Sequence, residues 1–181
     1  MKKLIYLILL SITVIACNQE QRYFAESNET NTLKEGIAAY EAGDWDTWVT
    51  HFADTAKIYV NSSEPMNVSE RVASLKEMSG AMSSYGFDHD EAHIEMVVDK
   101  NDETWVYFWG LHNGTIAANN KTLAIPVHIA VRFADGKIVA EHVYYDGTEL
   151  NAEFAALAAA AVGESSLGVT AGFDGGISGG G

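Results

Sequence analysis

Two stretches near the end of the chain alternate apolar and polar residues on either side of Asp135 and Gly136. Because successive side chains of a strand point to opposite faces, each stretch predicts a β-strand with one apolar face. An Asp-Gly pair accepts the positive φ angles of a type I′ turn, so residues 127–146 are predicted to form a β-hairpin. The residues predicted to face inward are Val127, Ile129, Val131, Phe133, Ile138, Ala140, His142, Tyr144 and Asp146.

The two-residue turn also sets the expected register of this hairpin. Phe133 should oppose Ile138, and Ile129 should oppose His142. His142 and Asp146 then lie in one row at the far end of the inner face. A carboxylate that points along an apolar wall costs free energy unless it is paired, protonated or used in chemistry. Asp146 is therefore the first candidate for a functional residue.

Helical periodicity and capping residues predict the remaining elements. Gly43 ends the first helix, and Asp44 caps a short second one. Asn67 and Glu70 form a capping pair for a third helix. The predicted helices span residues 32–42, a short segment after Asp44, residues 68–85 and 149–162, and the predicted strands span residues 57–60, 88–98, 104–116, 121–133 and 137–146. This order predicts an α+β fold, in which a cone-shaped, curved antiparallel sheet packs on N-terminal helices.

The loop at residues 117–120 decides which face of the preceding strand joins the core. If this loop has an even number of residues, His112 joins the inner face near Val127, and three aromatic residues point outward. These residues are Trp105, Tyr107 and Trp109. An odd number would turn the tryptophans into the pocket instead. A large aromatic outer face predicts a homodimer formed through the sheet.

The first 16 residues resemble a bacterial signal peptide. Lys2 and Lys3 precede an apolar segment, residues 4–15, that is too short to span a bilayer. The sequence Val14-Ile15-Ala16-Cys17 resembles a lipobox, which predicts cleavage before Cys17, the only cysteine, and acylation of that residue. Residues 17–30 then form an acylated polar tether, and the lipid on Cys17 is the only expected membrane contact. The expected location is the bacterial cell envelope, facing the periplasm or the surface, and the alternative is a free thiol after an ordinary signal peptide.

Charge and composition narrow the partners and the domain limits. The chain has 11 Lys and Arg against 25 Asp and Glu, a formal net charge of −14, which argues against a nucleic-acid partner. Residues 163–181 are glycine-rich and are predicted to form a disordered tail, which leaves residues 31–162 as one domain. His89 and His93 are four residues apart, a spacing that can bind a metal on a helix, but on a strand they would lie about 13 Å apart. We therefore expect no metal site. We also expect no cofactor.

Three short motifs resemble those of a known family. Asp135-Gly136-Lys137-Ile138, followed by a strand that ends in Tyr145-Asp146, resembles the last hairpin of the SnoaL-like polyketide cyclases. The segment 36–45 resembles the first helix of that family and its A-x-G-D corner, and His51-Phe52-Ala53-Asp54 resembles the approach to the first strand. These cyclases belong to the nuclear-transport-factor-2-like superfamily, which includes ketosteroid isomerase. The resemblance covers roughly residues 31 to 160 and implies the same cone-shaped fold.

The resemblance also implies that Asp146 is the acid/base residue of a cofactor-independent aldol cyclase or isomerase. A carboxylate in a partly apolar pocket has a raised pKa and can exchange protons at neutral pH. From the residues alone, Asp146 fits a cap of the helix near Thr148 equally well. His142 would be a second catalytic group or an inert structural histidine, and it stands where family members often have tryptophan.

Four further residues are predicted to line the pocket. Tyr144 would donate a hydrogen bond to an oxygen of the ligand or form part of the wall. His112 would steady an enolate oxygen. Trp48 and His51 would rim the mouth, and core packing is the simpler alternative for both.

Two functions fit these features. In the first, the cone binds a small hydrophobic molecule and Asp146 performs acid/base chemistry on it. In the second, the protein is a non-catalytic interaction or structural module of the cell envelope. A deep mouth lined by His142, Tyr144 and Asp146 would favour the first function, and a pocket plugged by Trp45 or Trp48 would favour the second.

Overall fold

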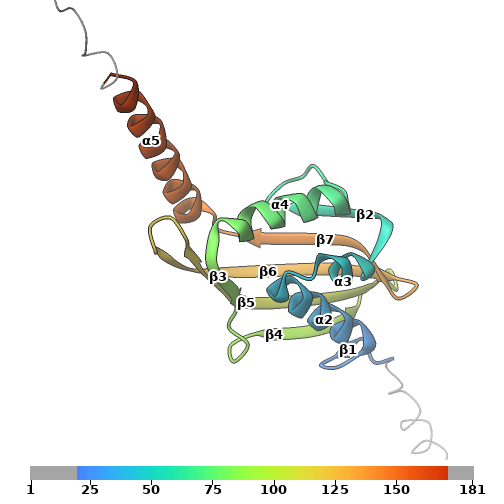
Figure 1. Ribbon diagram of the computed structural model, residues 1–181. Helices are drawn as coiled ribbons and strands as arrows, with labels where there is room; N and C mark the ends of the chain where they lie inside the picture. Colours follow the sequence, from blue (N-terminus) through green and yellow to red (C-terminus); the bar gives the residue numbers. More distant parts are fainter. Residues whose placement is uncertain (1–19, 171–181) are drawn as a thin grey trace, which may run out of the picture.

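A curved, seven-stranded sheet carries three helices on one of its faces (Figure 1). The computed structural model describes the backbone of residues 20–170 and the side chains of residues 20–161. The elements are β1 (Tyr23–Phe24), α2 (Asn28–Ala42), α3 (Trp45–Thr50), β2 (Phe52–Val60), α4 (Val68–Gly80), β3 (Met82–Phe87), β4 (His93–Val98), β5 (Thr104–Ile116), β6 (Thr122–Ala134), β7 (Lys137–Tyr145) and α5 (Thr148–Thr170). The predicted α+β class with a curved sheet is confirmed.

The sheet is mixed rather than purely antiparallel. Its strand order is β1-β4-β5-β6-β7-β2, and β3 pairs with the second half of β5. The edge strand β2 runs parallel to β7, with Ile58 opposite Glu141. A parallel pair needs a long connection, and here most of the domain lies between the two strands. The prediction of an all-antiparallel sheet is therefore wrong at this edge.

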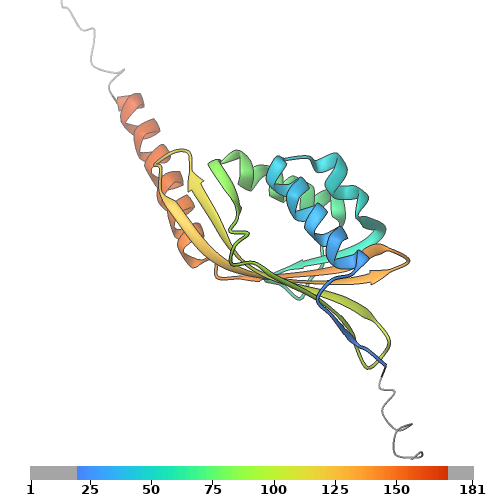
Figure 2. The ribbon, with the colours of Figure 1, turned by 90° about the horizontal axis from the view of Figure 1, so that it is seen from below.

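The helices α2, α3 and α4 lie on the same side of the sheet, and the described part of the chain places no helix on the opposite face (Figure 2). Helix α5 leads away from the end of the sheet (Figure 1). The two faces of the sheet therefore differ in burial. One face is covered by helices and contributes to the core, and no helix covers the other within the described residues.

Short-range signals in the sequence fix the helix ends as predicted. Gly43 has a φ of 67° and caps α2, and the Asp44 side chain accepts a hydrogen bond from the Thr47 backbone at the start of α3. Asn67 and Glu70 form the expected reciprocal capping box of α4. Helix α2 begins earlier than predicted, because Ser27 makes its own capping box at the N-terminus.

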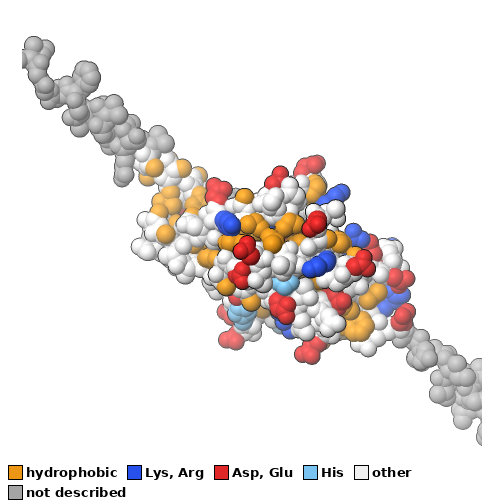
Figure 3. Space-filling model, turned by 45° about the vertical axis from the view of Figure 1, so that its right-hand side comes forward, with side chains coloured by type: hydrophobic (Ala, Val, Ile, Leu, Met, Phe, Trp, Pro, Cys, Tyr) orange, Lys and Arg blue, Asp and Glu red, His pale blue; other side chains and the backbone are white. Residues whose placement is uncertain are grey.

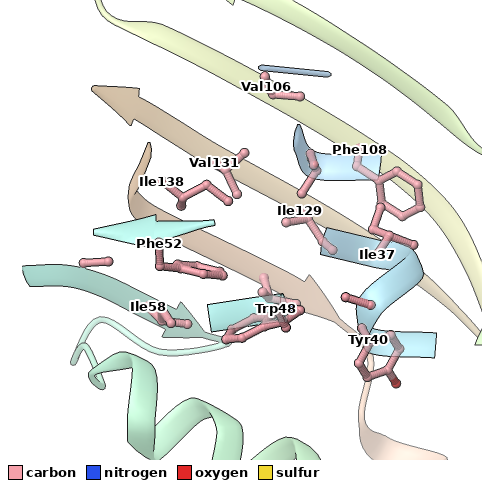
Figure 4. Packing of buried hydrophobic residues seen from close by; sticks show 14 of the residues in the cluster. Ile37, Tyr40, Trp48, Phe52, Ile58, Val106, Phe108, Ile129, Val131 and Ile138 are labelled. Carbon is pink, nitrogen blue, oxygen red and sulfur yellow. The ribbon is translucent and has the colours of Figure 1, made fainter. Parts of the chain in front are cut away.

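Buried side chains from the helices and from the inner face of the sheet form the main core (Figure 4). Trp48 packs on Phe52 with ring centroids 4.3 Å apart, and Ile58, Val106 and Val131 are fully buried. Each large apolar side chain removed from water contributes about 1.5–3 kcal/mol, so this cluster is the main source of stability. It anchors α2 and α3 to the centre of the sheet.

The third predicted helix is too long, and the sequence analysis missed a strand. Helix α4 ends at Gly80, and residues 82–87 form β3, where the prediction had helix as far as Tyr85. Tyr85 instead pairs with Gly114 of β5, and its ring lies 5.2 Å from that of Tyr40. Long-range pairing overrides local helical periodicity here. Strand β4 accordingly begins at His93 rather than at residue 88, and β2 begins at Phe52 rather than at Lys57.

The predicted turn at Asp135 and Gly136 is confirmed, since both residues have positive φ, 51° and 73°. The even loop before β6 is also confirmed, because the Ile116 N–H donates to the Lys121 carbonyl at 2.8 Å across it.

The register beyond the 135–136 turn is not as predicted. Phe133 does oppose Ile138, but the next residue, Arg132, opposes Ala140. Val139 is therefore an extra residue, a β-bulge, and the rest of β7 is shifted by one position. Because side chains alternate with a period of two, this single residue turns every later side chain to the other face. Ile129 opposes Val143 and not His142, so the predicted inward orientation of His142 and Tyr144 is wrong.

The two ends of the chain are described only in part. Helix α5 continues to Thr170, past the predicted end at residue 162. The predicted signal peptide, Cys17 and the last eleven residues of the chain lie outside the described residues. Within residues 20–170, no helix combines the length and the apolar character that crossing a membrane would require.

Candidate functional site

A cavity of about 100 Å³ lies between the helices and the inner face of the sheet. Its walls are mostly apolar, and we call it the inner cavity. Helices α2, α3 and α4, with the residue that follows α3, contribute Leu33, Gly36, Ile37, Tyr40, Trp48, His51, Arg71, Leu75 and Met78. The strands, with the start of α5, contribute Phe52, Met82, Phe87, His112, Gly114, Leu123, Ile125, Val127, Ile129, Ile138, Glu141, Val143, Tyr145 and Leu150. An apolar cavity with a few polar groups is the usual form of a small-molecule site.

Three of the site residues predicted from the sequence line this cavity. His112 comes from β5, His51 follows α3, and Trp48 lies on α3. His112 is buried, at 8% exposure, as the even loop requires. Trp48 belongs to both the cavity wall and the core, because it also packs against Phe52.

His142 and Tyr144 lie on the opposite, bare face of the sheet. The His142 ring stacks on Tyr59 with centroids 4.5 Å apart, and Tyr144 is 50% exposed. They join a row of neighbouring rings, some stacked and some tilted, that we call the outer aromatic face. It is made of Tyr59, Trp105, Tyr107, Trp109, His128, His142 and Tyr144. The bulge at Val139 places them there. The homodimer that this face suggests stays a prediction, which sedimentation velocity can test.

Asp146 also lies outside the inner cavity. Its Oδ1 accepts a hydrogen bond from the Thr148 backbone N–H at 2.9 Å, at the start of α5. Hydrogen bonds from the Thr148 side chain and backbone lower the pKa of this exposed carboxyl. A carboxyl that points into an apolar pocket would show the opposite shift. The helix-cap alternative therefore describes its position, and the predicted inward orientation of Asp146 is wrong.

The carboxyl group that does enter the cavity is Glu141, which is not among the residues predicted to face inward. It is 6% exposed, and it pairs with the fully buried Ile58. Burial raises the pKa of Glu141, and the nearby positive charge of Arg71 opposes that shift. One signal was present in the sequence. Ile138, Val139 and Ala140 are three apolar residues in a row, which a regular two-faced strand does not need.

Three buried polar side-chain atoms lack a hydrogen-bond partner within the described residues: His51 Nε2, Arg71 Nε and Glu141 Oε2. All three side chains line the inner cavity. A buried polar group without a partner costs about 1–3 kcal/mol, so each of these atoms calls for a partner such as a water, an ion or a ligand. Arg71 could have been found from the sequence, because it shares a helical stripe with Val68 and Leu75.

A second polar feature lies in the same cavity. The Tyr40 hydroxyl and His112 Nε2 form a buried hydrogen bond of 2.8 Å. Burial raises the pKa of Tyr40 and lowers the pKa of His112, so both side chains favour their neutral forms. Burial likewise lowers the pKa of His51. Neutral tyrosine and histidine can donate to or accept from a ligand oxygen without adding charge to the cavity.

Metal ligands do not cluster in the described part of the chain. No group of three or more His, Cys, Asp or Glu side chains comes together within residues 20–161. His89 instead lies 3.0 Å from Glu41.

The fold and the cavity together define a protein of the nuclear-transport-factor-2-like class, a curved sheet and its helices enclosing a small cavity. The family model of the SnoaL-like domain matches residues 33–141, and the chain belongs to this family. No curated protein matches.

Solved structures share the fold at low sequence identity. A proposed polyketide cyclase from Xanthomonas campestris is 17% identical, with a TM-score of 0.58 over 68% of this chain and 93% of the other. An NTF2-like protein of unknown function from Burkholderia pseudomallei is 15% identical, with a TM-score of 0.56 over 69% and 95%. A proposed SnoaL-like polyketide cyclase from Shewanella denitrificans is 12% identical, with a TM-score of 0.56 over 72% and 99%.

The buried Glu141 predicts a pH-dependent stability. Because its pKa is raised from the ordinary 4.5, the folded protein keeps a proton that the unfolded chain has already lost. The free energy of unfolding should therefore fall as pH rises from about 4.5 to the folded pKa, by at most about 1.4 kcal/mol per pH unit. Glu141→Gln should remove this decline. Urea unfolding across this pH range measures it.

The matched control is Glu77→Gln, which removes an exposed carboxylate of α4. This variant should keep the decline seen in the wild type. A decline that persists in Glu141→Gln would mean that another group causes it.

Proposed function

We propose that this protein binds a small hydrophobic molecule in the inner cavity. The observation that carries the proposal is the convergence of three buried polar atoms without protein partners, on His51, Arg71 and Glu141, in one apolar cavity. A packed core that served stability alone would have little reason to retain them, since each is costly. A ligand that supplies the missing partners would remove the cost. The alternative is a non-catalytic interaction module, in which the cavity is incidental.

Ligand entry should change the fluorescence of Trp48, which lines the cavity at 6% exposure. Titration with cyclohexanol should shift the emission of the wild type and raise its melting temperature. A ligand at one hundred times its dissociation constant stabilises the folded state by about 2.7 kcal/mol. Trp48→Phe should lose most of the fluorescence change.

The matched control is Trp109→Phe, on the outer aromatic face, where the side chain is 41% exposed. This variant should keep the response of the wild type. If Trp109→Phe loses the response and Trp48→Phe keeps it, the ligand binds on the outer face instead.

A second candidate function is cofactor-free acid/base chemistry of the aldol cyclase or isomerase type, with Glu141 in the role that the sequence suggested for Asp146. The buried carboxyl of Glu141 favours it, because a raised pKa brings proton exchange closer to neutral pH. The Tyr40–His112 pair can donate a hydrogen bond to an enolate oxygen in the same cavity.

Such a site should exchange the α-protons of cyclohexanone with solvent. Proton NMR in deuterium oxide follows the loss of these signals. Glu141→Gln should slow the exchange by about 10²-fold or more, because the amide cannot take up the proton. Asp146→Asn is the matched control and should exchange at the wild-type rate. If Asp146→Asn slows the exchange and Glu141→Gln does not, the acid/base residue is Asp146. If the wild type exchanges no protons, this second function is wrong and only the binding function remains.

We also propose that the protein is a bacterial envelope lipoprotein. The support is the sequence of residues 1–17, in which a basic start and a short apolar segment lead to the only cysteine. In a bacterial host, labelled palmitate should enter the wild-type chain, which should fractionate with membranes. Cys17→Ser should take up no label and should leave the membrane fraction. Equal labelling of both chains would contradict acylation at Cys17.

A further inference from the structure

The charged side chains of the inner cavity are Arg71 and Glu141, and they are not equivalent. Burial raises the pKa of Glu141, which favours its neutral form, whereas a guanidinium keeps its charge in any protein environment. His51 and His112 have lowered pKa values and also favour their neutral forms. The guanidinium of Arg71 is therefore the permanent charge of the cavity.

That positive charge has no ionic partner inside the domain. Among the described residues, Arg71 forms no ion pair, and its buried Nε has no hydrogen-bond acceptor. The other two arginines of the chain differ. Arg22 pairs with Asp102, and Arg132 pairs with Glu103. The chain has 25 acidic residues, and acidic side chains are spread over the face in Figure 3. The lack of an ion pair at Arg71 is therefore not due to a shortage of carboxylates.

Position explains why this lack of a partner matters. Arg71 lies in the first turn of α4, on the stripe that faces the sheet, and its side chain enters a wall that is mostly apolar. A partly desolvated guanidinium binds anions more strongly than an exposed one, because water competes less and the local dielectric is lower. Glu141 lies close enough for the Arg71 charge to affect it, yet the two form no ion pair.

We infer that the ligand of the inner cavity is a monocarboxylate with an apolar body. Its carboxylate accepts a hydrogen bond from the unpartnered Arg71 Nε, and its apolar part packs on side chains such as Leu75, Ile129 and Val143. This inference rests on the proposed binding function and specifies its ligand class. A neutral alcohol or ketone would fill the apolar part and leave the guanidinium without a counter-charge.

The test compares two ligands that differ only in the head group, hexanoate and hexanol. Isothermal titration of the purified full chain at neutral pH and low salt gives both affinities. We expect hexanoate to bind about tenfold or more tightly than hexanol, since hydrogen bonds between charged partners are roughly twice as strong as neutral ones. Cyclohexanecarboxylate in the same series separates a ring-shaped apolar body from a straight chain.

Arg71→Met should abolish the preference for hexanoate over hexanol. Arg71→Lys should retain part of it, because a positive charge remains. The matched control is Lys76→Met, which removes a positive charge from an exposed position on the same helix and should keep the full preference.

The outcomes separate this inference from the function on which it rests. If the wild type binds both ligands equally, the carboxylate inference is wrong and the binding function stands; this comparison needs no variant. If Arg71→Met folds and keeps the preference, or Lys76→Met loses it, Arg71 is not the receptor of the carboxylate. If neither ligand binds, the proposed binding function fails as well.

Discussion

One extra residue in β7 decides what the two faces of the sheet present. The bulge at Val139 lies three residues after Gly136, and every side chain beyond it points to the opposite face from the one predicted. Glu141, Val143 and Tyr145 therefore face the helices rather than the bare side. Without the bulge, His142 and Tyr144 would enter the core, and the outer aromatic face would lose the two rings that β7 contributes.

The energetic balance of the inner cavity follows from that choice. The helices bury a large apolar surface against the sheet, and this burial can offset a few costly polar groups. A carboxyl, a guanidinium and an imidazole are the groups retained there. The free-energy cost of burying them without partners is compatible with a binding site, because only polar atoms that lack a partner within the protein are available to hydrogen-bond a ligand.

Local signals made most of the fold predictable from the sequence. Gly43, Asp44 and the Asn67–Glu70 pair act over a few residues, so their helix ends came out as expected. Strands β5, β6 and β7 followed from alternation and from the Asp-Gly turn. Strand β3 did not, because only its pairing with β5 makes residues 82–87 extended.

The candidate site was harder to predict, since it depends on facing rather than on the presence of elements. His112, Trp48 and His51 were assigned by loop parity and by helical spacing, which the structure preserves. The structure buries Glu141 and exposes Asp146, the opposite of what regular alternation predicts, because alternation is interrupted at a bulge. The position of a bulge depends on the geometry of the neighbouring strands. The resemblance pointed to the end of β7, and the buried carboxyl lies five residues earlier along the same hairpin.

The parallel edge pair has a kinetic consequence. Ile58 meets Glu141 only after the chain has closed a loop that contains α4 and four strands, whereas β5, β6 and β7 join through short turns. Closing a long loop costs entropy before its contacts repay it, so pairs of high sequence separation form late. The antiparallel meander should therefore assemble first and β2 should dock last. Strand β2 would then pair with β7, which carries Glu141, in the last step, and the cavity would form only when folding is complete.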